Sequence, residues 1–202
     1  MNYKRDSSWN QRQLINQIIS EQKPYPLLTH NFVEYFIKKD LKNKTLLELG
    51  SGVSTIFWAD YFKEVYSYES DPNWIQKLKN EYGIPKNVEI NEVNPNTIFK
   101  DFKFLDYVKN CDYIIIDNNP NIVSREKYSQ YSIIHKKEDS QIILDNGTWN
   151  MNAYMLLQKY FFCQDFPGIN ISNQTTVTSL FFERKINYDY ESNTEKHTWL
   201  FE

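Results

Sequence analysis

Residues 45–71 read TLLELGSGVSTIFWADYFKEVYSYESD, and the fold of the whole chain can be worked out from this stretch. Its first apolar run, residues 46–49, is too short for a helix and predicts a buried strand. The run ends in Gly50-Ser51-Gly52. Because glycine lacks a side chain, the backbone can turn tightly at this point and approach a bound ligand closely.

A helix and a second strand are expected directly after this turn. Ser54 and Thr55 are residue types that favour the start of a helix, and residues 56–62 predict its body. An apolar and aromatic run then follows at 65–68 and ends in Glu69. The order of strand, glycine turn, helix, strand and acid is typical of a nucleoside-binding βαβ unit.

The length and charge of the chain limit its domain organisation and its partners. With 202 residues and a net charge of −3, it is expected to form one domain without a basic surface that would attract nucleic acid. We assign residues 1–40 to a helical flank, 41–185 to the core and 186–202 to a polar tail.

Membrane-spanning segments and cysteine motifs are not found in the sequence. No apolar run approaches the roughly 18 residues needed to cross a bilayer, and the first residues lack the apolar segment of a signal peptide. The two cysteines, Cys111 and Cys163, show neither disulfide nor metal-binding spacing. The sequence therefore predicts a soluble, cytoplasmic protein with no membrane partner.

Further apolar runs predict the remaining strands of a sheet. Residues 88–93, 111–117, 141–144 and 177–184 have strand character, and helical patterns separate most of them. Such alternation predicts a mostly parallel sheet with helices on both faces, which binds ligands beyond the carboxyl ends of its strands. The polar residues at predicted strand ends are Ser51, Glu69, Asp117, Asp145 and Asn146.

The two ends of the chain leave alternatives open. Helices expected at 11–21 and 30–39 can form either a lid over the glycine turn or a packing cap. Pro167-Gly168 is expected to break the chain, and the polar run 169–176 is expected to pair with the last strand as a hairpin. The final residues, HTWLFE, can add a short edge strand.

Glu69 and Glu48 suit different parts of a ligand. An acid at the end of the second strand can accept hydrogen bonds from both ribose hydroxyls, although an ordinary turn with a solvated glutamate has the same sequence. A dinucleotide fingerprint requires a third glycine where this chain has Thr55. Glu48, inside the first strand, is unfavourable beside a pyrophosphate and favourable beside a cationic ligand.

This first motif resembles that of the class I S-adenosylmethionine-dependent methyltransferases. Their motif has the form (V/L)LE(L/F)GSGxST, which residues 46–55 match, and their second strand also ends in an acid. The segments PLLTHNFVEYF (26–36) and TSLFFERK (178–185) are similar to those of small O-methyltransferases. The resemblance implies a Rossmann-like, doubly wound sheet of seven strands, the last antiparallel. It also implies the cofactor-binding residues Glu48, Gly50, Ser51, Gly52, Ser54, Thr55, Glu69 and Asp117.

Asp117 and Asp145-Asn146 form a second group, with oxygen atoms of the kind that Mg²⁺ or Ca²⁺ prefers. The group is similar to the metal site of catechol-type O-methyltransferases, which bind a divalent ion through an Asp and a later Asp-Asn pair. That likeness implies Mg²⁺ held by Asp117, Asp145 and Asn146. The family usually has a lysine base after the first acid, whereas Asn118-Asn119-Pro120 follows here. Methyltransferases without a metal also have acids at strand ends, so both interpretations stay open.

No side chain is identified as the general base. The histidines are each more typical of packing or surface residues: His30, His135 and His197. Arg125 and Lys127 can either meet an anionic substrate or form a solvated helix start. Trp149 is a candidate wall of the substrate site, whereas Trp58 and Trp74 are expected in the core.

Together these features predict S-adenosylmethionine-dependent methyl transfer to a small-molecule acceptor, at an oxygen atom. Asp117 and Asp145 are the expected catalytic residues, which orient the acceptor or activate it through a metal. The acidic pI of about 5.7 and the lack of an Asn-Pro-Pro-Tyr motif argue against a nucleic-acid substrate. A non-catalytic S-adenosylmethionine-binding module is the main alternative. A nicotinamide-dependent oxidoreductase is disfavoured by Glu48 and by the missing third glycine.

Overall fold

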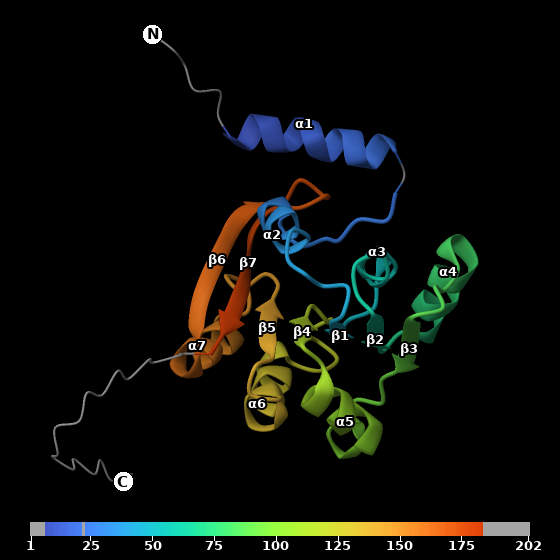
Figure 1. Cartoon of the computed structure of the whole chain (residues 1–202), viewed down its shortest axis with the longest axis vertical. Helices are drawn as coiled ribbons and strands as arrows, with labels where there is room; N and C mark the ends of the chain where they lie inside the picture. The colour runs from blue at the N-terminus through green and yellow to red at the C-terminus, as the bar shows by residue number, and fades with distance from the viewer. Residues whose placement is uncertain (1–6, 22, 184–202) are drawn as a thin grey trace, which may run out of the picture.

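The structure is a computed structural model that describes residues 7–21 and 23–183. One seven-stranded sheet runs through it in the order β3-β2-β1-β4-β5-β7-β6 (Figure 1). Its strands are β1 Thr45–Leu49, β2 Glu64–Glu69, β3 Val88–Glu92, β4 Tyr113–Ile116, β5 Gln141–Leu144, β6 Phe162–Ile169 and β7 Thr175–Phe182. β7 runs antiparallel to both of its neighbours, whereas β1 to β5 are parallel. The expected mostly parallel sheet with an antiparallel last strand is confirmed.

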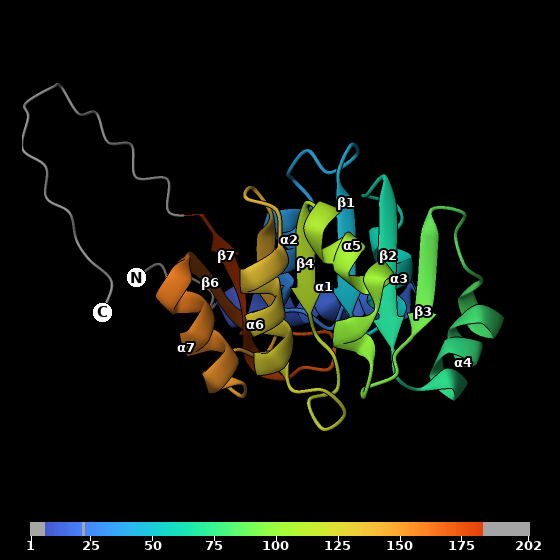
Figure 2. The same ribbon diagram turned by 90° about the horizontal axis from the view of Figure 1, so that it is seen from below.

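Helices cover both faces of this sheet, as Figures 1 and 2 show. They are α1 Ser7–Ser20, α2 His30–Phe36, α3 Val53–Trp58, α4 Pro72–Tyr82, α5 Phe102–Asn110, α6 Arg125–His135, α7 Met151–Tyr160 and the 3-10 turn η1 Ile98–Lys100. Successive residues of a strand point to opposite faces. Leu46 therefore packs in a cluster with Phe36 of α2 and Trp58 of α3. Leu47 packs in the opposite cluster with Phe104 of α5, so β1 is buried on both sides.

The glycine-turn unit is followed by a well-capped helix. Asp71 is the N-cap of α4, and its Oδ1 atom accepts a hydrogen bond from the backbone N–H of Asn73 at 2.9 Å. Pro72 occupies the first helical turn, where its missing N–H costs nothing. Gly83 ends the helix with a φ of 70°. The predicted start and end of this helix are confirmed.

The hairpin at the end of the sheet differs from the prediction. Pro167 and Gly168 do not break the chain but lie inside β6, where Pro167 pairs with Val177. The partner of the last strand is therefore β6 and not residues 169–176, most of which form the turn and the start of β7. β6 lies at the edge of the sheet, where a proline removes no ladder hydrogen bond. The predicted break was wrong because Pro-Gly interrupts a central strand but is accommodated in an edge strand such as β6.

Three predicted helices have different bounds in the structure. The helix whose body was expected over 56–62 is α3, which begins at Val53 after the N-cap residue Gly52 and ends at Trp58. The helix expected over 97–108 is divided into η1 and α5, because Asp101 caps α5 by accepting a hydrogen bond from the N–H of Lys103 at 2.8 Å. The helix expected over 30–39 ends at Phe36. The polar tail 186–202, with its expected edge strand, lies outside the described residues.

The N-terminal flank contributes both to packing and to a cavity. α2 buries Phe32 and Phe36 in the core, so it is a packing element. α1 contacts β6 and lies across the end of the sheet (Figure 1). Between the two helices, Lys23, Tyr25 and Leu27 face a cavity. Within the described parts of the chain, no helix has the length and apolar character required to cross a membrane.

Candidate functional site

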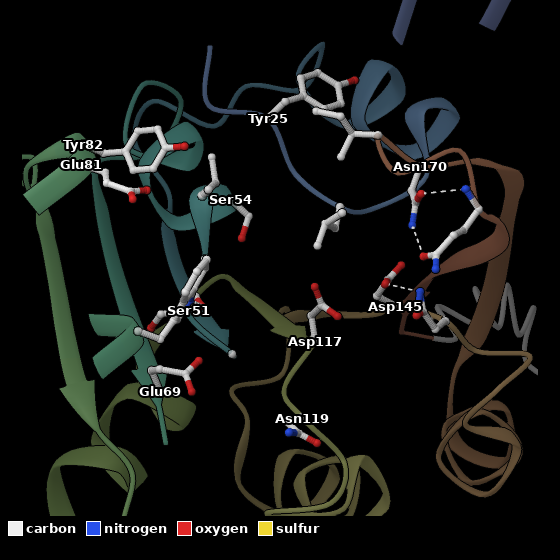
Figure 3. A pocket seen from close by; sticks show the side chains of 18 of the residues that line it. Tyr25, Ser51, Ser54, Glu69, Glu81, Tyr82, Asp117, Asn119, Asp145 and Asn170 are labelled. Atoms are coloured by element: carbon white, nitrogen blue, oxygen red, sulfur yellow. Dashed lines mark hydrogen bonds between the residues drawn. The ribbon is translucent and has the colours of Figure 1, made fainter. Parts of the chain in front are cut away.

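A cavity of about 950 Å³ lies beyond the carboxyl ends of β1, β2, β4 and β5 (Figure 3). Its walls come from the glycine turn, from α4, from the strand ends and from a roof. We use the term roof for residues 19–21 and 23–27 together with the β6–β7 turn, residues 170–174. Among the residues predicted for the site, those that line the cavity are Gly50, Ser51, Gly52, Ser54, Glu69, Asp117, Asp145 and Asn146. Glu48 and Thr55 are not among the lining residues.

The glycine turn brings the ends of β1 and β4 into close contact. Gly50 has a φ of +102°, which side-chain-bearing residues rarely adopt. A Cβ atom on Gly50 would lie 2.6 Å from the carbonyl oxygen of Asp117 and 2.7 Å from the Cα of Asn118. Only glycine therefore fits here, and its backbone lies directly beside Asp117.

Glu48 lies beneath the turn and is 1% exposed. Ser54 donates its Oγ hydrogen to Oε1 of Glu48 at 2.6 Å, and Thr55 donates to Oε2 at 2.5 Å. Burial raises the pKa of Glu48 to about 8, and these hydrogen bonds oppose the rise. Because the hydroxyl hydrogen of Ser54 is directed at Glu48, the Ser54 oxygen presents lone pairs to the cavity. Glu48 thus fixes the orientation of the Ser54 hydroxyl and does not itself line the cavity.

Glu69 is held at the end of β2 by the backbone that follows it. Its Oε1 atom accepts hydrogen bonds from the N–H groups of Ser70 at 2.7 Å and Asp71 at 2.9 Å. Its carboxylate points into the cavity (Figure 3). Trp74, which we expected in the core, also lines the cavity, and its indole N–H donates to the carbonyl of Ser51 at 2.8 Å. By contrast, Trp58 is fully buried, as expected.

Asp117 and Asp145 follow neighbouring strands, since Ile116 of β4 pairs with Leu144 of β5. Asp145 is 2% exposed, and its Oδ1 atom accepts a hydrogen bond from Thr178 of β7 at 2.7 Å. Burial raises the pKa of both carboxyl groups, and the charge of Asp117 raises that of Asp145 further. The two strands therefore bring the predicted catalytic pair together in a buried environment that disfavours two negative charges.

Arg125 contacts both Asp117 and Asp145, and it has neither of its two predicted roles. It is 7% exposed, so it is not part of a solvated helix start, whereas Lys127 is exposed. Its Nη2 atom donates to Oδ1 of Asp117 at 2.9 Å, and Nη1 donates to the carbonyl of Asp145 at 2.5 Å. Since its guanidinium is committed to the protein, Arg125 is not positioned to bind an anionic substrate.

The predicted metal ligands do not fit a divalent ion in this arrangement. Both carboxylate oxygens of Asp145 accept hydrogen bonds, Oδ1 from Thr178 and Oδ2 from the amide of Asn146. Asp117 is paired with a guanidinium. Across residues 7–21 and 23–183, no group of three or more His, Cys, Asp or Glu side chains is placed to hold a metal. We therefore assign no step to Mg²⁺.

The roof supplies residues that the sequence did not single out. Tyr25 lines the cavity, and its hydroxyl lies 2.6 Å from Nδ1 of His30, which is 4% exposed. Burial lowers the pKa of His30. On the other side, Asn170 and Gln174 add amide groups to the wall. Trp149, the predicted substrate wall, is exposed and is not one of the lining residues.

A chain of hydrogen bonds links Thr29, the N-cap residue of α2, to Asp145 through Thr178. The backbone N–H of Thr29 donates to Oγ1 of Thr178 at 2.9 Å, and this hydroxyl donates to Asp145. Both bonds are buried. The hydroxyl of Thr178 therefore satisfies one donor and one acceptor that water cannot easily reach.

Thr178→Val is expected to lower the free energy of unfolding by about 2–4 kcal/mol, because two buried polar groups lose their partner while the side-chain volume is kept. Thr176→Val is the matched control on the same strand. Its Oγ1 atom is buried with no hydrogen-bond partner among the described residues, so this change should shift stability by less than about 0.5 kcal/mol. Urea denaturation of both variants measures the difference. Equal stability losses would contradict the role given to Thr178.

No protein-family model matches this sequence, and no curated protein matches it. Solved structures do resemble it. An O-methyltransferase from Bacillus cereus in complex with S-adenosylhomocysteine has a TM-score of 0.62 at 13% identity, covering 90% of this chain and 93% of that one. The O-methyltransferase TomG from Streptomyces achromogenes, in complex with S-adenosylmethionine, has a TM-score of 0.56 at 13% identity, covering 89% and 91%.

A protein with a different role also has a similar structure. The fibrillarin pre-rRNA processing protein of Methanococcus jannaschii has a TM-score of 0.53 at 15% identity, covering 71% of this chain and 67% of that one. At such identities a likeness establishes the fold, and the acceptor differs among proteins that share a fold. The chain therefore has the fold that these solved structures share, two of which are O-methyltransferases.

Proposed function

We propose that this protein transfers a methyl group from S-adenosylmethionine to an oxygen atom of a small-molecule acceptor. The observation that carries the proposal is the position of Glu69. Its carboxylate is fixed at the end of β2 and faces the same cavity as the Gly50 turn and the Asp117–Asp145 pair. A nucleoside and an acceptor can therefore meet in one cavity, beyond the strand ends where this fold class binds ligands.

The cofactor half of the cavity is formed by the glycine turn, Glu69 and Ser54. Glu69 would accept hydrogen bonds from the ribose hydroxyls, and the bare backbone at Gly50 and Gly52 leaves room for the ligand to approach. The lone pairs of Ser54 face the cavity and suit an ammonium group. When bound, S-adenosylmethionine supplies an electrophilic methyl group attached to a sulfonium centre.

The acceptor half lies between the Asp117–Asp145 pair and the roof. Tyr25, Asn170 and Gln174 offer neutral hydrogen-bonding groups there, which suit a small polar molecule. Asp117, whose Oδ1 atom is hydrogen-bonded to Arg125, is placed to orient a hydroxyl group and to accept its proton as the oxygen bonds to the methyl carbon, and Asp145 supports it from the neighbouring strand end. The rest of the rate enhancement would come from holding the two reactants in line.

Glu69→Ala is expected to weaken the binding of S-adenosylhomocysteine by about 10- to 100-fold, as expected for the loss of charge-assisted hydrogen bonds. Isothermal titration calorimetry measures the affinity. Glu92→Ala is the matched control, because Glu92 is paired with Glu69 in the sheet but is exposed and does not line the cavity. Failure of the unmodified protein to bind S-adenosylhomocysteine would overturn the proposed function.

An assay of methyl transfer distinguishes an enzyme from a non-catalytic binding module with the same fold. The unmodified protein would be given methyl-labelled S-adenosylmethionine together with panels of alcohols, phenols and amines. Label transferred to a hydroxylated acceptor supports the proposal, and label found only on amines would move the reaction from oxygen to nitrogen. Tight cofactor binding without transfer to any panel would favour the non-catalytic module.

A further inference from the structure

Arg125 is a buried cation that reaches the two strand ends at which the predicted metal ligands lie. It is the first residue of α6, and its side chain is 8% exposed. Three nitrogen atoms donate in three directions: Nη2 to Oδ1 of Asp117, Nη1 to the carbonyl of Asp145 and Nε to the carbonyl of Asn118 at 3.1 Å. A planar guanidinium can satisfy such a set, whereas an ammonium group on a lysine cannot match its geometry.

The backbone around Arg125 fixes the side chain in this place. Ser124 caps α6 through a hydrogen bond accepted from the N–H of Lys127, and Ser129 donates to the carbonyl of Arg125 at 2.8 Å. Two of the three acceptors of the guanidinium are backbone carbonyls, whose positions follow from β4 and β5. Arg125 therefore belongs to the framework of the strand ends and does not depend on a ligand for its position.

The oxygen atoms near Arg125 are poorly suited to a divalent cation. Magnesium requires several oxygens with free lone pairs in octahedral geometry. Asp145 gives both of its carboxylate oxygens to donors, and the Asn146 amide turns its NH₂ group toward Asp145. A divalent ion on Asp117 would also lie close to a guanidinium that is already 2.9 Å from the same carboxylate, and the two positive charges would repel.

We propose that Arg125 is the resident cation of this site. It neutralises and positions Asp117 at the cavity, and it takes the electrostatic place of the divalent ion used by catechol-type O-methyltransferases. Arg125 is a positioning residue, since its nitrogen atoms contact Asp117 and backbone carbonyls and do not reach an acceptor. The part of this inference that concerns methyl transfer rests on the proposed function, whereas the part that concerns metal binding does not.

The first experiment titrates Mn²⁺ into five proteins and measures free Mn²⁺ by electron paramagnetic resonance. These are the unmodified chain and the variants Arg125→Met, Arg125→Lys, Lys127→Met and Asp117→Asn. Lys127 is an exposed cation on the same helix, so its variant controls for the loss of a positive charge. Thermal unfolding of each protein establishes that it is folded, and titration with S-adenosylhomocysteine tests the cofactor site separately.

The unmodified protein and Lys127→Met should show no Mn²⁺ binding up to about 1 mM. Arg125→Met, which removes the charge and leaves two acids at the strand ends, should bind Mn²⁺ at least about tenfold more tightly than the unmodified protein. Arg125→Lys keeps the charge and should not gain a site. Tight binding of Mn²⁺ by the unmodified protein, lost in Asp117→Asn, would overturn the inference, and so would unchanged Mn²⁺ affinity in a folded Arg125→Met.

A second measurement keeps the inference testable if Arg125→Met does not fold. Methyl transfer by the unmodified protein should be the same in excess chelator and in excess Mg²⁺, and a loss of more than about tenfold in chelator would overturn the inference. Failure of the proposed function has a different signature, because S-adenosylhomocysteine would not bind while the Mn²⁺ result would stand.

Discussion

Gly50→Ala is expected to lower the free energy of unfolding by about 3–5 kcal/mol and to abolish the binding of S-adenosylhomocysteine. Two destabilising effects add at this position, backbone strain and steric overlap. The φ of +102° is strained for alanine, and the new Cβ atom would lie 2.6 Å from the carbonyl oxygen of Asp117. Relief of this overlap requires β1 and β4 to separate at their carboxyl ends, which is where the cavity begins. The damage therefore affects folding and the cofactor half together.

Gly83→Ala is the control that separates backbone strain from steric overlap. Gly83 also has a positive φ, +70°, but a Cβ atom there would meet no atom within 4 Å. This control should lose only the conformational part, about 1–3 kcal/mol, and should keep its affinity for S-adenosylhomocysteine. Urea denaturation and calorimetry of both variants test the comparison. If both glycines prove equally replaceable, the close approach of β1 to β4 does not hold.

Glu48→Gln is expected to stabilise the protein at alkaline pH relative to the unmodified chain. Burial raises the pKa of Glu48 from its ordinary value of 4.5 to about 8. A raised pKa in the folded state favours folding most below pH 4.5, and this advantage is lost as the pH rises through 8. Since one pKa unit corresponds to about 1.4 kcal/mol, the loss can reach about 5 kcal/mol in a fully buried group.

The stability difference between Glu48→Gln and the unmodified protein should therefore grow from pH 5 to pH 9 in favour of the variant, by about 2–4 kcal/mol. Urea denaturation followed by tryptophan fluorescence measures it at each pH. Glu92→Gln, at an exposed position on β3, is the control and should show no such trend. A variant that becomes less stable than the unmodified protein at high pH would mean that Glu48 is already ionised in the folded state.

The strand ends of the site could be predicted because they follow from local sequence and from one rule of sheet geometry. Apolar runs located β4 and β5, and parallel neighbours end at the same edge of a sheet. This places Asp117 beside Asp145 without knowledge of any side-chain contact. The glycine turn was predictable for the same reason, since Gly50 directly follows an apolar run.

Arg125 could not be assigned in the same way. Its sequence context, a cation at the start of a helix, is identical for a solvated residue and for a buried one. The distinction depends on two carbonyls and one carboxylate that distant strands bring to it. The metal interpretation was open in the sequence because the positive charge that replaces the ion comes from outside the acidic motif.

The roof was missed because it is assembled from the two ends of the described chain. Tyr25 precedes the first strand, whereas Asn170 and Gln174 lie in the turn of a hairpin that we placed incorrectly. Hydrogen bonds fix that turn, since Oδ1 of Asn170 accepts from the N–H of Gln174 at 3.0 Å. Polar residues in such a turn have the same composition whether they line a cavity or face solvent.

Because β7 lies between β5 and β6 in the sheet, neither of these strands can complete its pairing during protein synthesis before β7 is made. β6 leaves the ribosome first, yet the strand with which it pairs is β7, residues Thr175–Phe182. The edge of β5 that faces away from β4 also has β7 as its hydrogen-bonding partner, so it stays unpaired until β7 has formed. A nascent chain that pauses before β7 therefore exposes two unpaired strand edges, which invite aggregation or capture by a chaperone. The sheet closes only when its last strand emerges, so folding of the core requires that residues 175–182 have been translated.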